Sequence, residues 1–137
     1  MIRVLIAEDQ AMLRGALATL LGLEKDIEVV AEVADGRAAL AALERDPPDV
    51  LLTDIEMPGA TGIELAQAAR DRQLATRVLI VTTFSRPGYL QRALQAGVHG
   101  YLLKDASSDE LAGAVRKVHA GERYVPPELA GLAWTTP

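Results

Sequence analysis

The fold of this chain is decided by the stretch Val50-Leu51-Leu52-Thr53-Asp54-Ile55-Glu56-Met57-Pro58-Gly59. It opens with apolar and β-branched residues, which are typical of a strand buried on both faces of a parallel sheet. Asp54 stands where the apolar run ends, and Pro58-Gly59 breaks the chain shortly after it. Ligands of open α/β sheets bind beyond the carboxyl ends of the strands. The pattern therefore predicts that Asp54 lies where chemistry takes place and not in the core.

The composition is that of a small folded domain, and it excludes several kinds of partner and site. The chain has 137 residues, half of them hydrophobic, which is enough for one domain with a proper core and a short tail. A net charge of −5 without a run of Lys or Arg argues against direct binding of nucleic acid. The absence of cysteine excludes disulfides and thiolate metal sites. No apolar run approaches the roughly 18 residues of a membrane span, and the start shows no signal peptide, so we expect a cytoplasmic protein.

Strand-like and helix-like segments alternate along the chain. The predicted strands are 2–7, 27–33, 50–53, 78–81 and 100–103. The predicted helices are 11–23, 37–45, 63–70, 87–96 and a last helix from about 108 to about 121. This alternation predicts βαβ units with right-handed crossovers, and therefore a parallel sheet with helices on both faces.

Capping residues mark several predicted helix starts. We expect Asp9 to cap the first helix and Ser85 to cap the helix that begins at Pro87. Capping boxes are predicted for two more helices, Thr61 with Glu64 and Ser107 with Glu110. In the first helix the leucines at helical spacing should face the core: Leu13, Leu17, Leu20 and Leu21.

Polar residues stand at the ends of four predicted strands: Glu8 and Asp9, Asp54, Thr82, and Lys104. Three carboxylates at one sheet edge repel one another unless a cation lies among them. Oxygen ligands without His or Cys select a hard cation, and Mg²⁺ fits. Asp54 is also a possible nucleophile that forms an aspartyl-phosphate, whose charge Mg²⁺ and Lys104 would neutralise. Thr82 could donate a hydrogen bond to that product.

Together with Gly100-Tyr101, these residues resemble the receiver domain of bacterial two-component response regulators, over residues 2–121. The phrases Ile-Ala-Glu-Asp-Gln, Asp-Ile-Glu-Met-Pro-Gly and Gly-Tyr-Leu-Leu-Lys-Asp look most like the NarL/FixJ class and its branch of desaturase regulators. The resemblance implies a single domain with a flavodoxin-like (βα)5 doubly wound parallel sheet in the strand order 2-1-3-4-5.

The resemblance also implies the roles of the acidic residues. Asp54 would be the phosphoacceptor and would take the phosphoryl group from a sensor histidine kinase. Glu8, Asp9 and Asp54 would hold Mg²⁺ together with the backbone carbonyl of Glu56. The side chain of Glu56 lies two residues past the acceptor, where receivers control the access of water to the acyl phosphate.

Other residues would stabilise the phosphoryl group or respond to it. The resemblance assigns Thr82, Thr83 and Lys104 to phosphate stabilisation, and Thr82 with Tyr101 to the conformational switch. In that switch Thr82 moves toward the phosphoryl oxygen and Tyr101 rotates inward; an ordinary core tyrosine is the alternative for Tyr101. Receivers commonly have a proline after the lysine, often with a cis bond, whereas Asp105 follows Lys104 here and leaves the bond geometry open.

The predicted domain organisation is a receiver over residues 1–121 and a linker or tail over 122–137, for which a short helix over 128–134 is the alternative. The resemblance implies that a C-terminal helix-turn-helix domain outside this chain contacts DNA. It also implies a homodimer on phosphorylation, with the changed surface on the last two helices and the last strand. No contact with a membrane is expected.

Two other functions compete with the phosphorylation switch. A haloacid-dehalogenase-like aspartyl-phosphate phosphatase would have its nucleophile on the first strand and a second Asp two residues later. Here the candidate is on the third strand and Glu56 fills the second place. A receiver-like interaction module without phosphorylation would not need Asp54 and Lys104. We therefore expect that the chain is not an enzyme, except that it catalyses its own phosphorylation and dephosphorylation.

Overall fold

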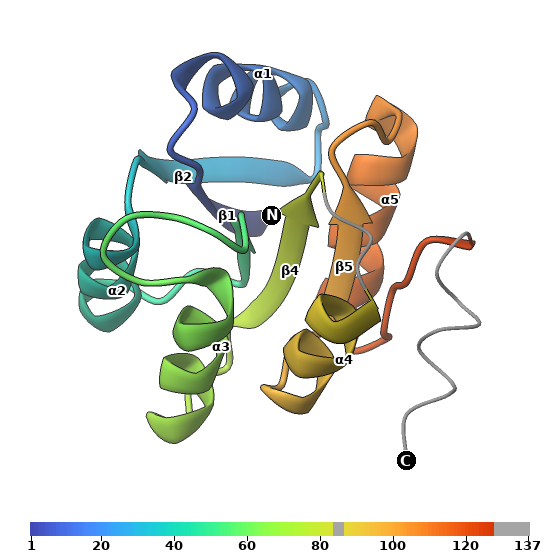
Figure 1. Ribbon diagram of the computed structural model, residues 1–137. Helices are drawn as coiled ribbons and strands as arrows, with labels where there is room; N and C mark the ends of the chain where they lie inside the picture. The colour runs from blue at the N-terminus through green and yellow to red at the C-terminus, as the bar shows by residue number, and fades with distance from the viewer. Residues whose placement is uncertain (84–86, 128–137) are drawn as a thin grey trace.

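A computed structural model describes residues 1–83 and 87–127 as a five-stranded parallel sheet in the order β2-β1-β3-β4-β5 (Figure 1). The strands are β1 Ile2–Ala7, β2 Ile27–Val33, β3 Val50–Thr53, β4 Arg77–Thr82 and β5 Gly100–Leu103. The helices are α1 Ala11–Gly22, α2 Gly36–Arg45, α3 Gly62–Asp71, α4 Pro87–Gln95 and α5 Ser108–His119. The flavodoxin-like doubly wound sheet and its strand order are confirmed.

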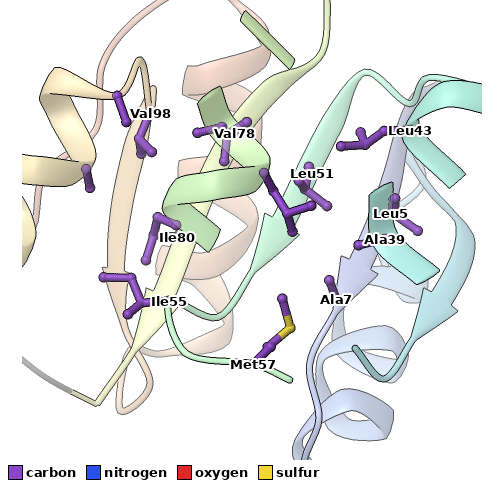
Figure 2. Packing of buried hydrophobic residues seen from close by; sticks show 14 of the residues in the cluster. Leu5, Ala7, Ala39, Leu43, Leu51, Ile55, Met57, Val78, Ile80 and Val98 are labelled. Atoms are coloured by element: carbon purple, nitrogen blue, oxygen red, sulfur yellow. The ribbon is translucent and has the colours of Figure 1, made fainter. Parts of the chain in front are cut away.

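The sheet separates two hydrophobic clusters, because successive side chains of a strand point to opposite faces. On one face Leu5 and Leu51 pack with residues of α2, α3 and α4, and Figure 2 shows part of this cluster. On the other face Ile6 and Leu52 pack with residues of α1 and α5. The central strands β1, β3 and β4 are therefore covered on both sides, which is why they are almost continuously apolar.

The first helix differs from the prediction in its cap and in one leucine. Gln10 takes the capping position without a side-chain hydrogen bond, so the prediction that Asp9 caps α1 is wrong. The carboxylate of Glu8 instead accepts the N–H of Gln10, at 2.9 Å. Leu17 and Leu21 are buried as predicted, but Leu20 is 37% exposed, because its position lies beyond the stripe that faces the sheet.

The two predicted capping boxes have different outcomes. The box of α3 is confirmed, with Thr61 and Glu64 bonded in both directions at 2.9 and 3.1 Å. At α5 the Ser107 hydroxyl accepts the N–H of Glu110 at 3.1 Å, but the Glu110 carboxylate accepts the hydroxyl of Tyr124 instead of completing the box. The predicted cap Ser85 and the predicted helix 128–134 lie outside the described residues. None of the helices described here is both long enough and apolar enough to cross a bilayer.

His99 lies between α4 and β5, at the edge of the sheet opposite Asp54. Its Nδ1 accepts the backbone N–H of Val78 at 3.1 Å, and its own N–H donates to the Val78 carbonyl at 2.8 Å. Burial, followed by the positive charges of Arg77 and Arg123, lowers the pKa of His99 below its ordinary value of 6.5. The folded protein therefore favours the neutral imidazole, which is the form that can accept this hydrogen bond.

We expect His99 to make the fold sensitive to mild acid. Since its pKa is lowered in the folded state, its stabilising contribution is complete above the unfolded pKa and is lost as the pH falls below about 6.5. The variant His99→Asn, whose amide oxygen replaces Nδ1 as acceptor, should lose less thermal stability between about pH 7.5 and about pH 5.5 than the wild type. His119→Asn, at an exposed position of α5, should keep the wild-type pH dependence. Parallel curves for the wild type and His99→Asn would contradict this assignment.

Candidate functional site

Asp54 lies at the carboxyl end of β3, between the ends of β1 and β4. Its N–H donates to the carbonyl of Ala7 at 3.1 Å, which continues the pairing of β3 with β1 by one residue. Its carboxylate is 11% exposed. Oδ1 accepts the N–H of Ile55 at 2.7 Å, and Oδ2 lies 3.0 Å from Nζ of Lys104. Both oxygens are therefore oriented by the protein, while the side chain can still be reached from solvent.

Glu8, Asp9 and Asp54 form one acidic cluster, as the strand-end pattern predicts. Each offers a carboxylate oxygen, and these oxygens lie within 4.8 Å of one another. Glu8 is buried, whereas Asp9 is exposed at the rim. Burial raises the pKa of Glu8, and the neighbouring Asp9 and Asp54 add to that rise. The cluster therefore concentrates negative charge where water cannot fully solvate it.

The donor set of this cluster fits a magnesium ion. Oε1 of Glu8 is buried and has no hydrogen-bond partner, although it lies 3.2 Å from Nζ of Lys104. A buried carboxylate oxygen without a hydrogen bond is costly unless a cation compensates it. Lys104 pairs with two of the three clustered carboxylates, Glu8 and Asp54, and carboxylates without His or Cys suit Mg²⁺. Glu8, Asp9 and Asp54 would hold the ion, and the carbonyl of Glu56 is the fourth predicted ligand.

Lys104 joins the end of β5 to the acidic cluster. Its N–H donates to the carbonyl of Thr82 at 2.9 Å, and its Nζ lies between Asp54 and Glu8. Burial disfavours the charged ammonium, but the hydrogen bond and charge of Asp54, and then Glu8, outweigh burial and raise the pKa of Lys104. The described residues contain no cis peptide bond, so the bond between Lys104 and Asp105 is trans.

The predicted phosphate and switch residues lie on β4 and β5 beside this cluster. Thr82 is buried at the end of β4, and Thr83 is exposed. A depression of about 360 Å³ is lined by Thr83, Leu103, Lys104 and Asp105. Tyr101 is fully buried, and burial, followed by the charge of Asp54 and by Tyr89, raises its pKa to about 12. Tyr101 therefore occupies the inward position in this structure, and its rotation stays a prediction.

Sequence reasoning missed Tyr89, which contacts the site from α4. Its hydroxyl donates to Oε1 of Glu56 at 3.0 Å, and the guanidinium of Arg92 lies 4.8 Å from the centre of its ring. The bond turns the exposed Glu56 carboxylate toward α4. No spacing pattern could reveal it, since 33 residues separate the two partners.

Gly62 allows the loop after Asp54 to close tightly under the site. Its N–H donates to the carbonyl of Ile55 at 2.8 Å. A Cβ at this position would lie 2.4 Å from the backbone oxygen of Asp54 and 2.8 Å from a methyl group of Ile80. Only glycine fits the start of α3 without moving Asp54.

The chain belongs to the response regulator receiver domain family, whose model matches residues 4–116. It is 53% identical over 129 residues to the transcriptional regulatory protein DesR of Bacillus subtilis (strain 168). That alignment covers 94% of this chain but only 64% of DesR, so the chain spans less than two thirds of this relative.

Two solved structures support the same assignment. The receiver domain of the putative response regulator NarL from Mycobacterium tuberculosis has a TM-score of 0.86 and 37% identity, over 88% of this chain and 98% of that one. A DNA-binding response regulator of the LuxR family from Staphylococcus aureus has a TM-score of 0.83 and 42% identity, over 87% of this chain and 99% of that one. Within the family, the chain is therefore a receiver of the NarL/FixJ class, as the resemblance implied.

Substituting two glycines should have opposite effects on stability. Gly62→Ala should lower the free energy of unfolding by about 1–3 kcal/mol, because the new methyl group meets backbone atoms of Asp54. Gly15→Ala, at an exposed position of α1 with nothing within 4 Å, should raise it by about 0.5–1 kcal/mol through helix propensity. Urea unfolding of both variants measures these changes. A Gly62→Ala variant as stable as the wild type would show that the loop is not tightly packed.

Proposed function

We propose that this chain is a phosphorylation-activated receiver in which Asp54 accepts a phosphoryl group from the phosphohistidine of a sensor kinase. The observation that carries the proposal is the position of Lys104, whose ammonium lies 3.0 Å from Asp54 and 3.2 Å from Glu8. An ammonium at this point can neutralise both the acceptor carboxylate and the oxygens of an incoming phosphoryl group.

The transfer itself requires little covalent chemistry from the protein. A carboxylate oxygen of Asp54 forms the bond to phosphorus while the P–N bond to the kinase histidine breaks, and the nitrogen keeps the electron pair. The ammonium of Lys104 pairs with the phosphoryl oxygens as negative charge builds up on them, and the Thr82 hydroxyl donates a hydrogen bond to one of them. Mg²⁺, when bound by the acidic cluster, would neutralise further phosphoryl charge. Water later cleaves the acyl phosphate and releases inorganic phosphate, so the chain acts only on its own phosphoryl group.

A phosphatase that turns over small esters is less well supported. It would need a second acid beside the nucleophile to protonate the leaving group. The carboxylate of Glu56, two residues after Asp54, is instead bonded to Tyr89. This bond argues against Glu56 as the second acid of such a phosphatase.

The output of this receiver would be transcriptional control through another domain. The printed names of its relatives include a transcriptional regulatory protein and a DNA-binding response regulator. The chain carries a net charge of −5, which disfavours direct contact with DNA phosphates. DNA contact would therefore belong to a helix-turn-helix domain outside this chain, and phosphorylation would act on it through dimerisation.

Phosphorylation should depend on Asp54 alone and on a divalent cation. Acetyl phosphate with Mg²⁺ should add one phosphoryl group per chain by intact mass spectrometry, and chelation by EDTA should prevent it. Asp54→Ala should remain unmodified, whereas Asp71→Asn, at an exposed position at the end of α3, should be modified like the wild type. Many turnovers of small phosphate esters would favour the phosphatase, and an unmodified wild type would favour the inert interaction module.

Beryllofluoride with Mg²⁺ should shift the chain from monomer to dimer in sedimentation velocity, and Asp54→Ala should stay monomeric. Among residues 1–83 and 87–127, the large exposed apolar residues after Met1 lie on α1 or directly after it: Met12, Leu20 and Leu23. If the dimer covers this apolar surface rather than α4, α5 and β5, Met12→Lys should weaken the dimer while still binding beryllofluoride. An unchanged monomer in the wild type would contradict dimerisation, and a normal dimer of Met12→Lys would move the contact to another surface.

A further inference from the structure

A pocket of about 360 Å³ lies at the edge of the sheet opposite Asp54, where α3 and α4 both end (Figure 1). Val78 of β4 and Val98, just before β5, line it, and both are labelled in Figure 2. Its apolar lining is completed by small and aliphatic residues of α3 and the loop after it: Ala66, Ala69 and Leu74. Pockets that hold small molecules measure roughly 300–1,000 Å³ and are mostly apolar. We call this space the arginine pocket.

The polar part of the lining carries positive charge. Arg70 reaches the pocket from the last turn of α3 and Arg123 from the segment after α5, and the lining contains no Asp or Glu. Across residues 1–83 and 87–127, neither guanidinium forms an ion pair with a carboxylate. Arg77 adds a third charge nearby, since it and Arg123 together lower the pKa of His99. Positive charge is therefore concentrated here, although the whole chain has a net charge of −5.

Both arginines are held in place by backbone contacts around the pocket. Nη1 of Arg70 donates to the carbonyl of Gln95 at the end of α4, at 3.1 Å. The N–H of Tyr124 donates to the carbonyl of His99 at 3.1 Å, which fixes the backbone next to Arg123 against the edge of β5. Capping the end of α4 accounts for one donor of Arg70, but a guanidinium has five. The other donors can bind a ligand.

Two more side chains bring hydrogen-bond donors to the lining. Nδ1 of His99 accepts the N–H of Val78, so Nε2 carries the proton of the neutral imidazole and can donate. Gln73 ends α3 with a φ of 56°, a conformation in which helices usually place glycine. A side chain at such a position costs stability, and here its amide lines the pocket. The pocket therefore combines positive charge and donors with an apolar surface.

We propose that the arginine pocket binds a small organic anion, with a carboxylate or phosphate-type group on a compact apolar body. Arginine suits both groups, because its planar guanidinium donates two parallel hydrogen bonds to two oxygens. The apolar lining would remove the body of the ligand from water. The inference is independent of the proposed phosphorylation of Asp54, since the pocket lies at the other edge of the sheet.

NMR titration of the full chain in the presence of EDTA tests this ligand class. Phenylphosphonate and benzoate each present an oxyanion on one ring, whereas benzyl alcohol lacks the charge and inorganic phosphate lacks the ring. At least one of the two aromatic anions should shift the Gly97 and His99 amides saturably, with a Kd of about 1 mM or lower. The tighter of the two identifies the anionic group, and both controls should bind about tenfold more weakly. No saturable shift with either aromatic anion up to about 10 mM, or equal binding of either control, would overturn the proposal.

Matched variants locate the site. Arg70→Gln and Arg123→Gln should each weaken binding about tenfold. Arg72→Gln removes the same charge from an exposed position just after α3, outside the lining, and should bind like the wild type. Gln73→Gly should weaken binding without lowering thermal stability, which loss of a merely structural side chain would not do. Asp54→Ala should bind normally, which separates this site from phosphorylation. Wild-type affinity in both Arg70→Gln and Arg123→Gln would overturn the proposal.

Discussion

Repulsion among three carboxylates at one end of a parallel sheet is the constraint around which this domain is built. Glu8 and Asp54 are largely withdrawn from water, and the nearest compensating charge is the ammonium of Lys104. Burial makes such charges expensive, and the opposite charge makes them tolerable. The site is therefore suited to bind a cation, which relieves the excess negative charge of the carboxylates. It is also suited to accept a phosphoryl group, which redistributes that charge. The apolar strands that lead to it keep these side chains from moving apart.

The same arrangement makes β5 the strand that joins the site to the rest of the molecule. Lys104 at its end meets the acidic cluster, Tyr101 in its middle fills the core, and its outer edge pairs with Tyr124. On the opposite side of the site, the bond between Glu56 and Tyr89 connects the loop after β3 with α4. Local changes of charge at Asp54 thus have two short routes to the surface. The route through α4 depends on one hydrogen bond, and the route along β5 depends on the Lys104–Asp54 pair and two backbone hydrogen bonds.

Much of the fold and of the site could be predicted from periodicity and strand ends. Apolar runs predict the strands, and the polar residues directly after them predict that Glu8, Asp9, Asp54 and Lys104 lie together, as they do in the structure. Leu20 is exposed because it lies beyond the buried stripe of α1, whereas the two capping misses each involve a hydrogen-bond partner that the local pattern does not predict. Asp9 was predicted to cap α1, but the neighbouring carboxylate of Glu8 takes the N–H of Gln10 instead. Glu110 was predicted to complete a capping box, but a more distant tyrosine takes its carboxylate. In both capping misses a competing partner decided the outcome.

The sequence by itself determined the class of fold, the edge of the sheet that carries the chemistry and the residue types gathered there. These follow from local pattern, since a buried strand must be apolar and must end where polar residues begin. Only the tertiary structure decided which partners the polar groups choose: Tyr89 for Glu56, Tyr124 for Glu110, and the edge of β5 for the segment after α5. Such choices depend on distances between residues far apart in the chain, and those distances exist only once the helices have packed on the sheet.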